Sequence, residues 1–201
     1  MTLVDLADGL PRLCLPPGDA LDRHALEQAS LILVGGGLVV VRTTFPGSTR
    51  RMITCHAGAG ALVLPPEDDE LLVALTDAVL VPISADARER IIASPDGARL
   101  LVDGLAETLR QKHGTIASLS RLHHVDRVRE KLIELAREHG RVGRDGIRLD
   151  FPLTHDLLGE MVGSARETVT RALDELQREG FVVRRGRIYS VNLEPEELAT
   201  S

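Results

Sequence analysis

The chain has 201 residues and a formal net charge of −6, from 24 Lys and Arg against 30 Asp and Glu. This length fits one domain or two small ones, and a hydrophobic content of 43% excludes a wholly disordered chain. Two cysteines are too few for a four-cysteine zinc or iron–sulfur site. The N-terminus lacks the pattern of a secretory signal, and no apolar run approaches the ~18 residues of a membrane span. We therefore expect a cytoplasmic protein with no cofactor, no metal and no membrane partner.

Short apolar runs alternate with turn residues over residues 1–96. The runs are Leu31–Val34, Leu38–Thr43, Thr49–Cys55, Leu71–Leu75 and Ala78–Ile83. The first two flank Gly35–Gly37, which predicts a β-hairpin, and Phe45–Ser48 is a second turn signal. Many short strands with close turns are typical of a small sandwich or barrel.

A helical pattern occupies residues 97–124. From Ala98 to His123 the sequence contains no proline and keeps one heptad phase, on Ala98, Val102, Leu105, Leu109, Lys112, Ile116, Leu119 and His123. Such a seam predicts a coiled-coil dimer interface from Val102 to His123, the alternative being a long helix packed on its own domain. Gly104 and Gly114 each weaken an isolated helix by ~1 kcal/mol, so packing against a partner must hold it.

Residues 125–201 have the pattern of a winged helix-turn-helix. A helix over Val125–Glu138 stops at Gly140, and Ile147–Leu149 is a short strand. Thr154 can cap a helix that runs to Val162, and Gly163 gives a tight turn. Ser164–Glu167 has the form of a capping box for the next helix, which ends at Gly180. Two further strands, Phe181–Arg185 and Arg187–Val191, flank Gly186.

The helix after Ser164 carries the candidate base-reading residues. Its inner face is Val169, Ala172, Leu173 and Leu176, and its outer face carries Arg166, Glu167 and Arg171. Arg can donate two hydrogen bonds to guanine, and Glu can accept one from cytosine. We expect phosphate contacts, which position the protein without reading sequence, from Thr154, Ser164, Thr168, Thr170, Arg184, Arg185 and Arg187. Residues 164–188 carry a net charge of +2 and the remainder −8, which favours one aimed surface over general polyanion binding.

The stretch LTHDLLGEMVGSARETVTRALDELQREGFVVRRGRIYSV, residues 153–191, resembles the DNA-binding domain of the Crp-Fnr family of bacterial transcription regulators. The segment from Gly163 to Arg171 is similar to the recognition-helix signature of that family. The resemblance implies an α+β fold with an N-terminal β-roll of the jelly-roll type, related to cyclic-nucleotide-binding domains, then a long dimerisation helix and a winged helix-turn-helix. The cAMP-receptor branch has Arg, Glu and Arg at the positions of Arg166, Glu167 and Arg171 and reads a TGTGA-like half-site, so the resemblance implies a homodimer on a palindromic operator in double-stranded DNA.

The sensor half departs from that family pattern. Cyclic-nucleotide binders hold the ribose and phosphate with a Gly-Glu motif and an Arg-Ser pair. The matching stretch, residues 58–77, is shorter and has Ala61 and the acidic run Glu67–Glu70 instead. Like charges disfavour a cyclic phosphate. The Thr-Ser pair that meets adenine in the cAMP receptor falls at Lys112 and His113, so we expect a degenerate pocket without cAMP dependence.

Other sensor chemistries stay open as weaker alternatives. Cys55 and His56 resemble haem ligands only loosely, and a thiol switch through Cys14 and Cys55 has no sequence support for a lowered thiol pKa. His123 and His124 lie where the long helix meets the next one, and their protonation could move a hinge. Neutral, hydrogen-bonded histidines without a signalling role are the simpler interpretation.

The leading hypothesis is a homodimeric, sequence-specific transcription regulator that needs no small effector. An activator of this kind would also contact RNA polymerase, although no motif distinguishes activation from repression. The alternatives are a regulator gated by an unknown ligand or redox signal, and a winged helix that binds a protein. The sequence has no nucleophile–base spacing, phosphate-binding glycine loop or metal-ligand cluster, so we expect no enzyme activity.

Overall fold

The computed structural model describes residues 2–121, 123–143, 146–186 and 188–193. The chain divides into two units, residues 1–114 and 115–201. No helix within the described ranges is long and apolar enough to cross a bilayer. Each unit has its own sheets and core.

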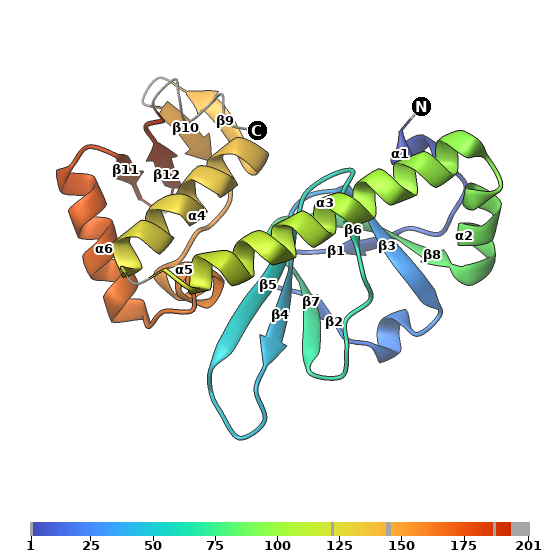
Figure 1. Cartoon of the computed structure of the whole chain (residues 1–201), viewed down its shortest axis with the longest axis horizontal. Coiled ribbons are helices and arrows are strands. Elements are labelled where there is room, and N and C mark those ends of the chain that lie inside the picture. The colour runs from blue at the N-terminus through green and yellow to red at the C-terminus, as the bar shows by residue number, and fades with distance from the viewer. Residues whose placement is uncertain (1, 122, 144–145, 187, 194–201) are drawn as a thin grey trace. The chain divides into compact units, whose positions relative to one another are not determined.

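The first unit is a β-roll with helices packed against one of its two sheets (Figure 1). Its strands are β1 (Leu13–Leu15), β2 (Ala20–Leu21), β3 (Ala29–Gly36), β4 (Val39–Thr44), β5 (Arg51–Ala57), β6 (Leu62–Val63), β7 (Glu70–Ala74) and β8 (Ala78–Ser84). Its helices are α1 (Leu3–Leu6), the 3-10 turn η1 (His24–Leu26), α2 (Ala85–Ile92) and the first part of α3 (Pro95–Leu119). The strands form two antiparallel sheets, in the orders β1-β8-β3-β6 and β2-β7-β4-β5.

Strand β3 is apolar on both faces because it separates two cores. Ile32 and Val34 point into the roll, where they pack with Val39, Leu72 and Leu80. Leu31 and Leu33 point the other way, into a second cluster that holds Leu3, Ala87, Ile91 and Leu101 of the helices. Successive side chains of a strand alternate between faces, so a continuous apolar run is what a strand between two cores requires.

The predicted hairpin across Gly35–Gly37 is wrong. Strand β3 pairs with β6 and β8, whereas β4 pairs with β5 and β7, so the glycines carry the chain from one sheet to the other. Gly37 has φ +79°, and a Cβ there would lie 2.2 Å from the carbonyl oxygen of Asp77. The glycines therefore allow two backbone segments to approach closely. The burial of β3 on both of its faces decides which strands it pairs with. The true hairpin is β4–β5, joined by the predicted turn at Phe45–Ser48, where Ser48 N donates to Phe45 O at 3.0 Å.

Helix α3 has two different long faces. Leu101, Thr108 and Thr115 are buried, and Thr108 Oγ1 donates to the carbonyl of Leu62 at 2.8 Å. Gly104 lets β6 approach, since a Cβ there would lie 2.8 Å from Leu62 Cδ1. The prediction of one helix from Ala98 to His123 is too long, because the helix ends at Leu119. A seam that continues along this helix to His123 is therefore wrong.

The second unit is a small three-helix core with a four-stranded sheet. It comprises α4 (His124–His139), β9 (Gly140–Gly143), β10 (Gly146–Leu149), α5 (His155–Val162), α6 (Arg166–Arg178), β11 (Val182–Arg185) and β12 (Ile188–Val191). The antiparallel sheet has the order β11-β12-β10-β9. The predicted helices and the two-stranded wing are confirmed within one or two residues, while β9 escapes prediction because it has one apolar residue, Val142.

Replacing Gly37 with Ala should destabilise the β-roll by at least about 1 kcal/mol, because an L-residue at this φ is strained and its Cβ meets a backbone oxygen. The midpoint of urea unfolding measures the loss. Gly36→Ala is the matched control, since no atom lies within 4 Å of a Cβ there. Equal midpoints for the two variants would refute the assigned turn.

Candidate DNA-binding surface

Helix α5 begins at a capping threonine, and its turn to α6 depends on two glycines. Thr154 caps α5, its Oγ1 accepting from Leu157 N at 3.1 Å, as predicted. Gly163 ends the helix in the left-handed conformation, φ +62°. Gly159 is needed for closeness, because a Cβ there would lie 2.7 Å from Ser164 O. The two helices therefore meet in a tight, glycine-dependent turn.

The predicted capping box at Ser164 is wrong. The N-cap of α6 is Ala165, which offers no side-chain hydrogen bond. Ser164 lies one residue earlier, and its Oγ is 2.9 Å from Nδ1 of His124, the first residue of α4. Arg127 donates to the same nitrogen, so His124 Nδ1 is an acceptor and the ring is the Nε2–H tautomer. Tertiary contact with α4 has displaced the local cap.

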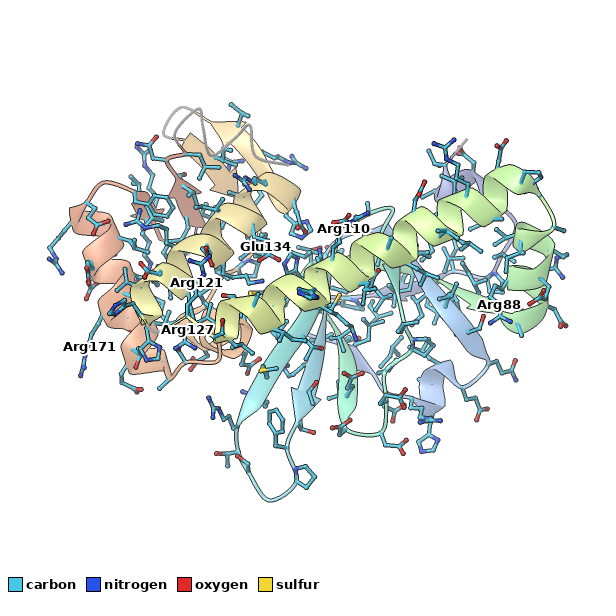
Figure 2. The ribbon with its side chains drawn as sticks, viewed as in Figure 1. Arg88, Arg110, Arg121, Arg127, Glu134 and Arg171 are labelled. Atoms are coloured by element: carbon cyan, nitrogen blue, oxygen red, sulfur yellow. The ribbon has the colours of Figure 1, made fainter. Side chains whose placement is uncertain are left out.

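Helix α6 presents opposite faces to core and solvent. Its buried residues are Val169, Ala172, Leu173 and Leu176, as predicted. Arg166, Glu167 and Arg171 are exposed in the first half of the helix, and Arg171 projects away from the protein core in Figure 2. Arg171 makes no ion pair within the described part of the chain. The three residues thus share one accessible surface.

Asp156 of α5 competes for one of these arginines. Its Oδ2 lies 3.4 Å from Arg166 Nη1, with side chains 57% and 64% exposed. A solvated pair of this kind contributes little stability. Arg166 is therefore steered toward α5 but remains available to another acceptor.

His155 joins α5, α6 and the wing. Its Nδ1 lies 2.7 Å from Thr170 Oγ1 and its Nε2 lies 3.0 Å from the hydroxyl of Tyr189 on β12. Thr170 Oγ1 in turn lies 3.0 Å from the carbonyl oxygen of Arg166. Sequence reasoning missed this cluster because its members are 15 and 34 residues apart, and no local pattern links them.

The environment of His155 favours the neutral ring. Burial, the largest cause, and the charges of Arg184 and Arg166 hold the pKa of His155 below its ordinary value of 6.5, while Asp174 and Asp156 act in the opposite direction. Burial also raises the pKa of Tyr189, so its hydroxyl keeps its proton at neutral pH.

The wing carries the other basic residues. Arg184 Nε donates to the carbonyl of Gly186 at 2.9 Å, and its guanidinium lies 5.7 Å from the centre of the Tyr189 ring. Arg185 is exposed beside it, and Arg187 lies outside the described residues. Among the remaining predicted phosphate contacts Thr154 is exposed, Thr168 is half-buried, and Ser164 and Thr170 already have hydrogen-bond partners.

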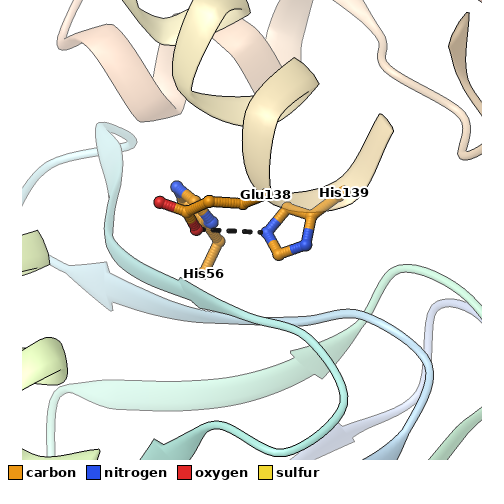
Figure 3. Close-up of side chains that lie close together, drawn as sticks. All are labelled: His56, Glu138 and His139. Carbon is orange, nitrogen blue, oxygen red and sulfur yellow. Dashed lines mark ion pairs between the residues drawn. The ribbon is translucent and has the colours of Figure 1, made fainter. Parts of the chain in front are cut away.

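The other end of α4 carries a second pair of titratable groups. His139 Nε2 lies 3.6 Å from Glu138 Oε2 in the last turn (Figure 3), an ion pair only when the histidine is protonated. The same helix holds a buried Lys131, whose Nζ lies 2.5 Å from Glu134 Oε2. These pairs satisfy charges of α4 within its own unit.

The predicted interface residues on α3 differ in exposure. Val102, Leu109 and Ile116 are 64%, 68% and 70% exposed. Leu105 is also exposed, and Lys112 and Leu119 are half-buried. His123 lies off the helix, as the N-cap of α4, and is exposed. An apolar stripe in solvent along a helix is the surface that a partner would cover.

The β-roll holds a cavity and a partly neutralised acidic run. The cavity, about 390 Å³, lies between α3 and the strands β5 and β6, and Cys55, Leu62, Leu100, Thr108 and Gln111 are among its lining residues. Cys55 is buried, its Sγ 3.5 Å from Gln111 Oε1, whereas Cys14 is exposed. In the acidic run, Glu67 and Asp68 pair with Arg23 at 2.9 and 3.5 Å.

The two units together define a class, a β-roll followed by a winged helix-turn-helix. Residues 126–199 match the Crp-like helix-turn-helix domain. A CRP-family transcriptional regulator of Thermus thermophilus has a similar structure, with a TM-score of 0.75 and 20% identity over 94% of this chain and 97% of that one.

Curated relatives agree over part of the chain. The global nitrogen regulator of Synechocystis sp. PCC 6803 is 34% identical over 112 residues, 55% of this chain and 49% of that protein. A CRP-like cAMP-activated global transcriptional regulator of Mycobacterium tuberculosis is 29% identical over 114 residues, 56% of this chain and 51% of that protein. The chain spans about half the length of the curated relatives it matches. The comparisons therefore identify a Crp-like helix-turn-helix domain in residues 126–199, and the likeness of the whole chain to the solved regulator, at 20% identity, is one of fold.

Proposed function

We propose that this chain is a homodimeric transcription regulator that binds a TGTGA-like palindrome in double-stranded DNA without cAMP. The observation that carries the proposal is the outer face of α6. There Arg166, Glu167 and Arg171 are exposed together in the first half of a helix whose other face is buried. Such a helix fits the major groove and offers guanine and cytosine partners.

Phosphate contacts fall to the residues around that helix. Arg184 and Arg185 on the wing, with Arg187 beyond the described residues, supply charge that fixes register but reads no base. Thr154 and Thr168 offer hydroxyl groups at the starts of α5 and α6. Ser164 and Thr170 are weaker candidates, because His124 and His155 already engage their hydroxyls.

A palindromic operator calls for two copies of the chain related by a two-fold axis. The exposed stripe Val102, Leu105, Leu109 and Ile116 on α3 is the surface that we assign to the second copy, with Lys112 and Leu119 at its edges and His123 beyond its end. This assignment gives three functional parts, a sensor-like roll over residues 1–96, a dimerisation helix and hinge over 97–124, and a DNA-binding domain over 125–201. Such a regulator acts in the cytoplasm, and RNA polymerase is its partner if it activates transcription.

Independence from cAMP is supported by the roll. Its interior is filled by apolar side chains, including Ile32, Val41, Leu72 and Leu80. The loop in the place of a phosphate cradle carries the carboxylates of Glu67 and Asp68. Arg23 pairs with both of them, so its charge is already used within the protein. Carboxylates beside a cyclic phosphate would oppose its binding. The Mycobacterium tuberculosis relative is described as cAMP-activated, but this chain matches only 51% of that protein.

A second candidate is the same regulator gated by an unidentified small molecule. The cavity of about 390 Å³ against α3 favours it, because its mostly apolar lining reaches the helix to which we assign dimerisation. A redox gate through Cys55 has less support, since the thiol is buried. The remaining alternative, a winged helix that binds a protein, has less support, because a protein partner does not require two arginines placed to bind guanine.

Arg166→Ala should cost about 1–3 kcal/mol of discrimination between the palindrome TGTGA-N6-TCACA and a scrambled duplex. Arg185→Ala should weaken binding to both duplexes alike and reduce the salt slope by about 1. Fluorescence anisotropy at several salt concentrations measures both. Arg178→Ala, at the far end of α6, is the matched control, and full discrimination by Arg166→Ala would contradict the assigned base contact.

Leu109→Asp should give a monomer that stays folded, because the side chain is 68% exposed but lies on the proposed interface. Burying two aspartates against each other is costly. Light scattering measures the mass and circular dichroism the fold. Arg110→Asp, exposed on the same helix but about 100° around it from Leu109, should remain dimeric, and a Leu109→Asp dimer would rule out this interface.

Unfolding the purified protein in urea, washing it and refolding it should leave operator binding unchanged if no effector is needed. Anisotropy before and after this treatment, and again with added cAMP, gives the comparison. Loss of selective binding after washing, with native mass spectrometry detecting a released molecule, would favour the gated candidate. Selectivity that requires cAMP would contradict the proposed independence.

A further inference from the structure

The hydrogen bonds around His155 have one consistent direction. The carbonyl of Arg166 can only accept, so the Thr170 hydroxyl donates to it, over 3.0 Å. Because its single hydroxyl proton is already donated, Thr170 Oγ1 can only accept from His155, whose Nδ1 therefore carries a hydrogen. The neutral ring then has a lone pair at Nε2, which accepts from the Tyr189 hydroxyl. A single tautomer, Nδ1–H, satisfies every group in the chain.

We propose that His155 is a positioning residue for DNA recognition, whose neutral imidazole locks the recognition helix α6 to the wing strand β12. The three hydrogen bonds run from Tyr189 on the wing, through the first residue of α5, to the backbone of Arg166 in the first turn of α6. The hydrogen bonds that join α6 to β12 through His155 do not depend on what the protein binds. The role of His155 in DNA recognition rests on the proposed function.

The lock joins the base-reading and the phosphate-contacting parts of the surface. Arg166 belongs to α6, and Arg184 of β11 lies over the ring of Tyr189. A recognition surface needs its groups held within about 0.5 Å of their working geometry. Without the imidazole, α6 and the wing would keep their packing but lose the hydrogen bonds that fix them to each other.

Protonation of His155 would reverse the hydrogen bond at Nε2. The cation has donors at both nitrogens, so the Tyr189 hydroxyl can only accept there, and its own proton loses its acceptor at a buried site. The charged groups that face the ring are Arg184 of β11 and Arg166 of α6, which disfavour the cation, and Asp174 of α6 and Asp156 of α5, which favour it. Tyr189 of β12 keeps its proton, because burial raises its pKa. The lock is therefore a property of the neutral ring.

The pH dependence of stability follows from the lowered pKa of His155. Between that pKa and 6.5, the unfolded chain binds more protons at this residue than the folded one. The contribution of His155 to stability is therefore complete above pH 6.5 and is lost as the pH falls toward the folded pKa. His155→Gln should remove this component from the pH profile of the thermal midpoint.

The first test is the tautomer, measured without DNA. In ¹⁵N NMR spectra of the full chain at pH 7.5, the signal that disappears in His155→Gln should show a protonated Nδ1 and an unprotonated Nε2. Thr170→Val should shift that signal, and Thr170→Ser, which keeps the hydroxyl, should not. The opposite tautomer, or no response to Thr170→Val, would overturn the lock.

The second test is selectivity, taken as the ratio of affinities for operator and scrambled duplex so that a general charge effect cancels. At pH 7.5, His155→Gln and Tyr189→Phe should each lower this ratio about 3- to 10-fold, and the double variant no further. The wild-type ratio should be constant above pH 6.5 and fall as the pH drops toward the lowered pKa of His155, while that of His155→Gln stays flat. His24→Gln, at an exposed histidine of the β-roll, should behave as wild type.

The outcomes separate the lock from the proposed function. A His155→Gln protein with wild-type selectivity and pH profile would overturn the positioning role. If the wild-type chain shows no selectivity for the palindrome or for any duplex from a random library, the proposed function fails, and the tautomer and stability profiles still decide whether the lock exists.

Discussion

Packing of the inner face of α6 is the constraint on which the DNA-binding surface depends. Val169, Ala172, Leu173 and Leu176 are almost completely buried, and the 3.6-residue period of the helix then leaves no choice about which residues face solvent. Arg166 and Arg171 are exposed for this reason alone. The chemistry of the surface is thus set by which residues occupy the remaining positions, and two arginines with a glutamate form a set suited to bases.

Charge is distributed in keeping with that surface. The chain is acidic overall, so a polyanion has little attraction to most of it. Near α6, Asp156 pairs with Arg166 through solvent-exposed side chains, so it competes with any other acceptor for this arginine. Under the proposed function a base edge must displace this carboxylate, and because the pair is solvent-exposed the displacement costs little.

Features that depend on residues close together in the sequence were predictable, whereas features that depend on contacts between distant residues were not. The cap at Thr154, the left-handed Gly163 and the apolar periodicity of α4 and α6 depend on neighbours within a turn, and each agrees with the structure. The hairpin across Gly35–Gly37 failed because glycines permit a turn without choosing the partner strand. The box at Ser164 failed because His124, 40 residues away, offered the hydroxyl a better position. The cluster around His155 was invisible for the same reason.

The two histidine contacts hold the helix-turn-helix at different places. His124, the first residue of α4, bonds Ser164 in the turn just before α6, and His155, where α5 begins, bonds Thr170 one turn inside α6. The rings use opposite tautomers, because Arg127 makes Nδ1 of His124 an acceptor while Thr170 makes Nδ1 of His155 a donor. The two contacts lie on either side of the start of α6, so they add hydrogen bonds at the first turn to the orientation that the buried face of the helix already fixes.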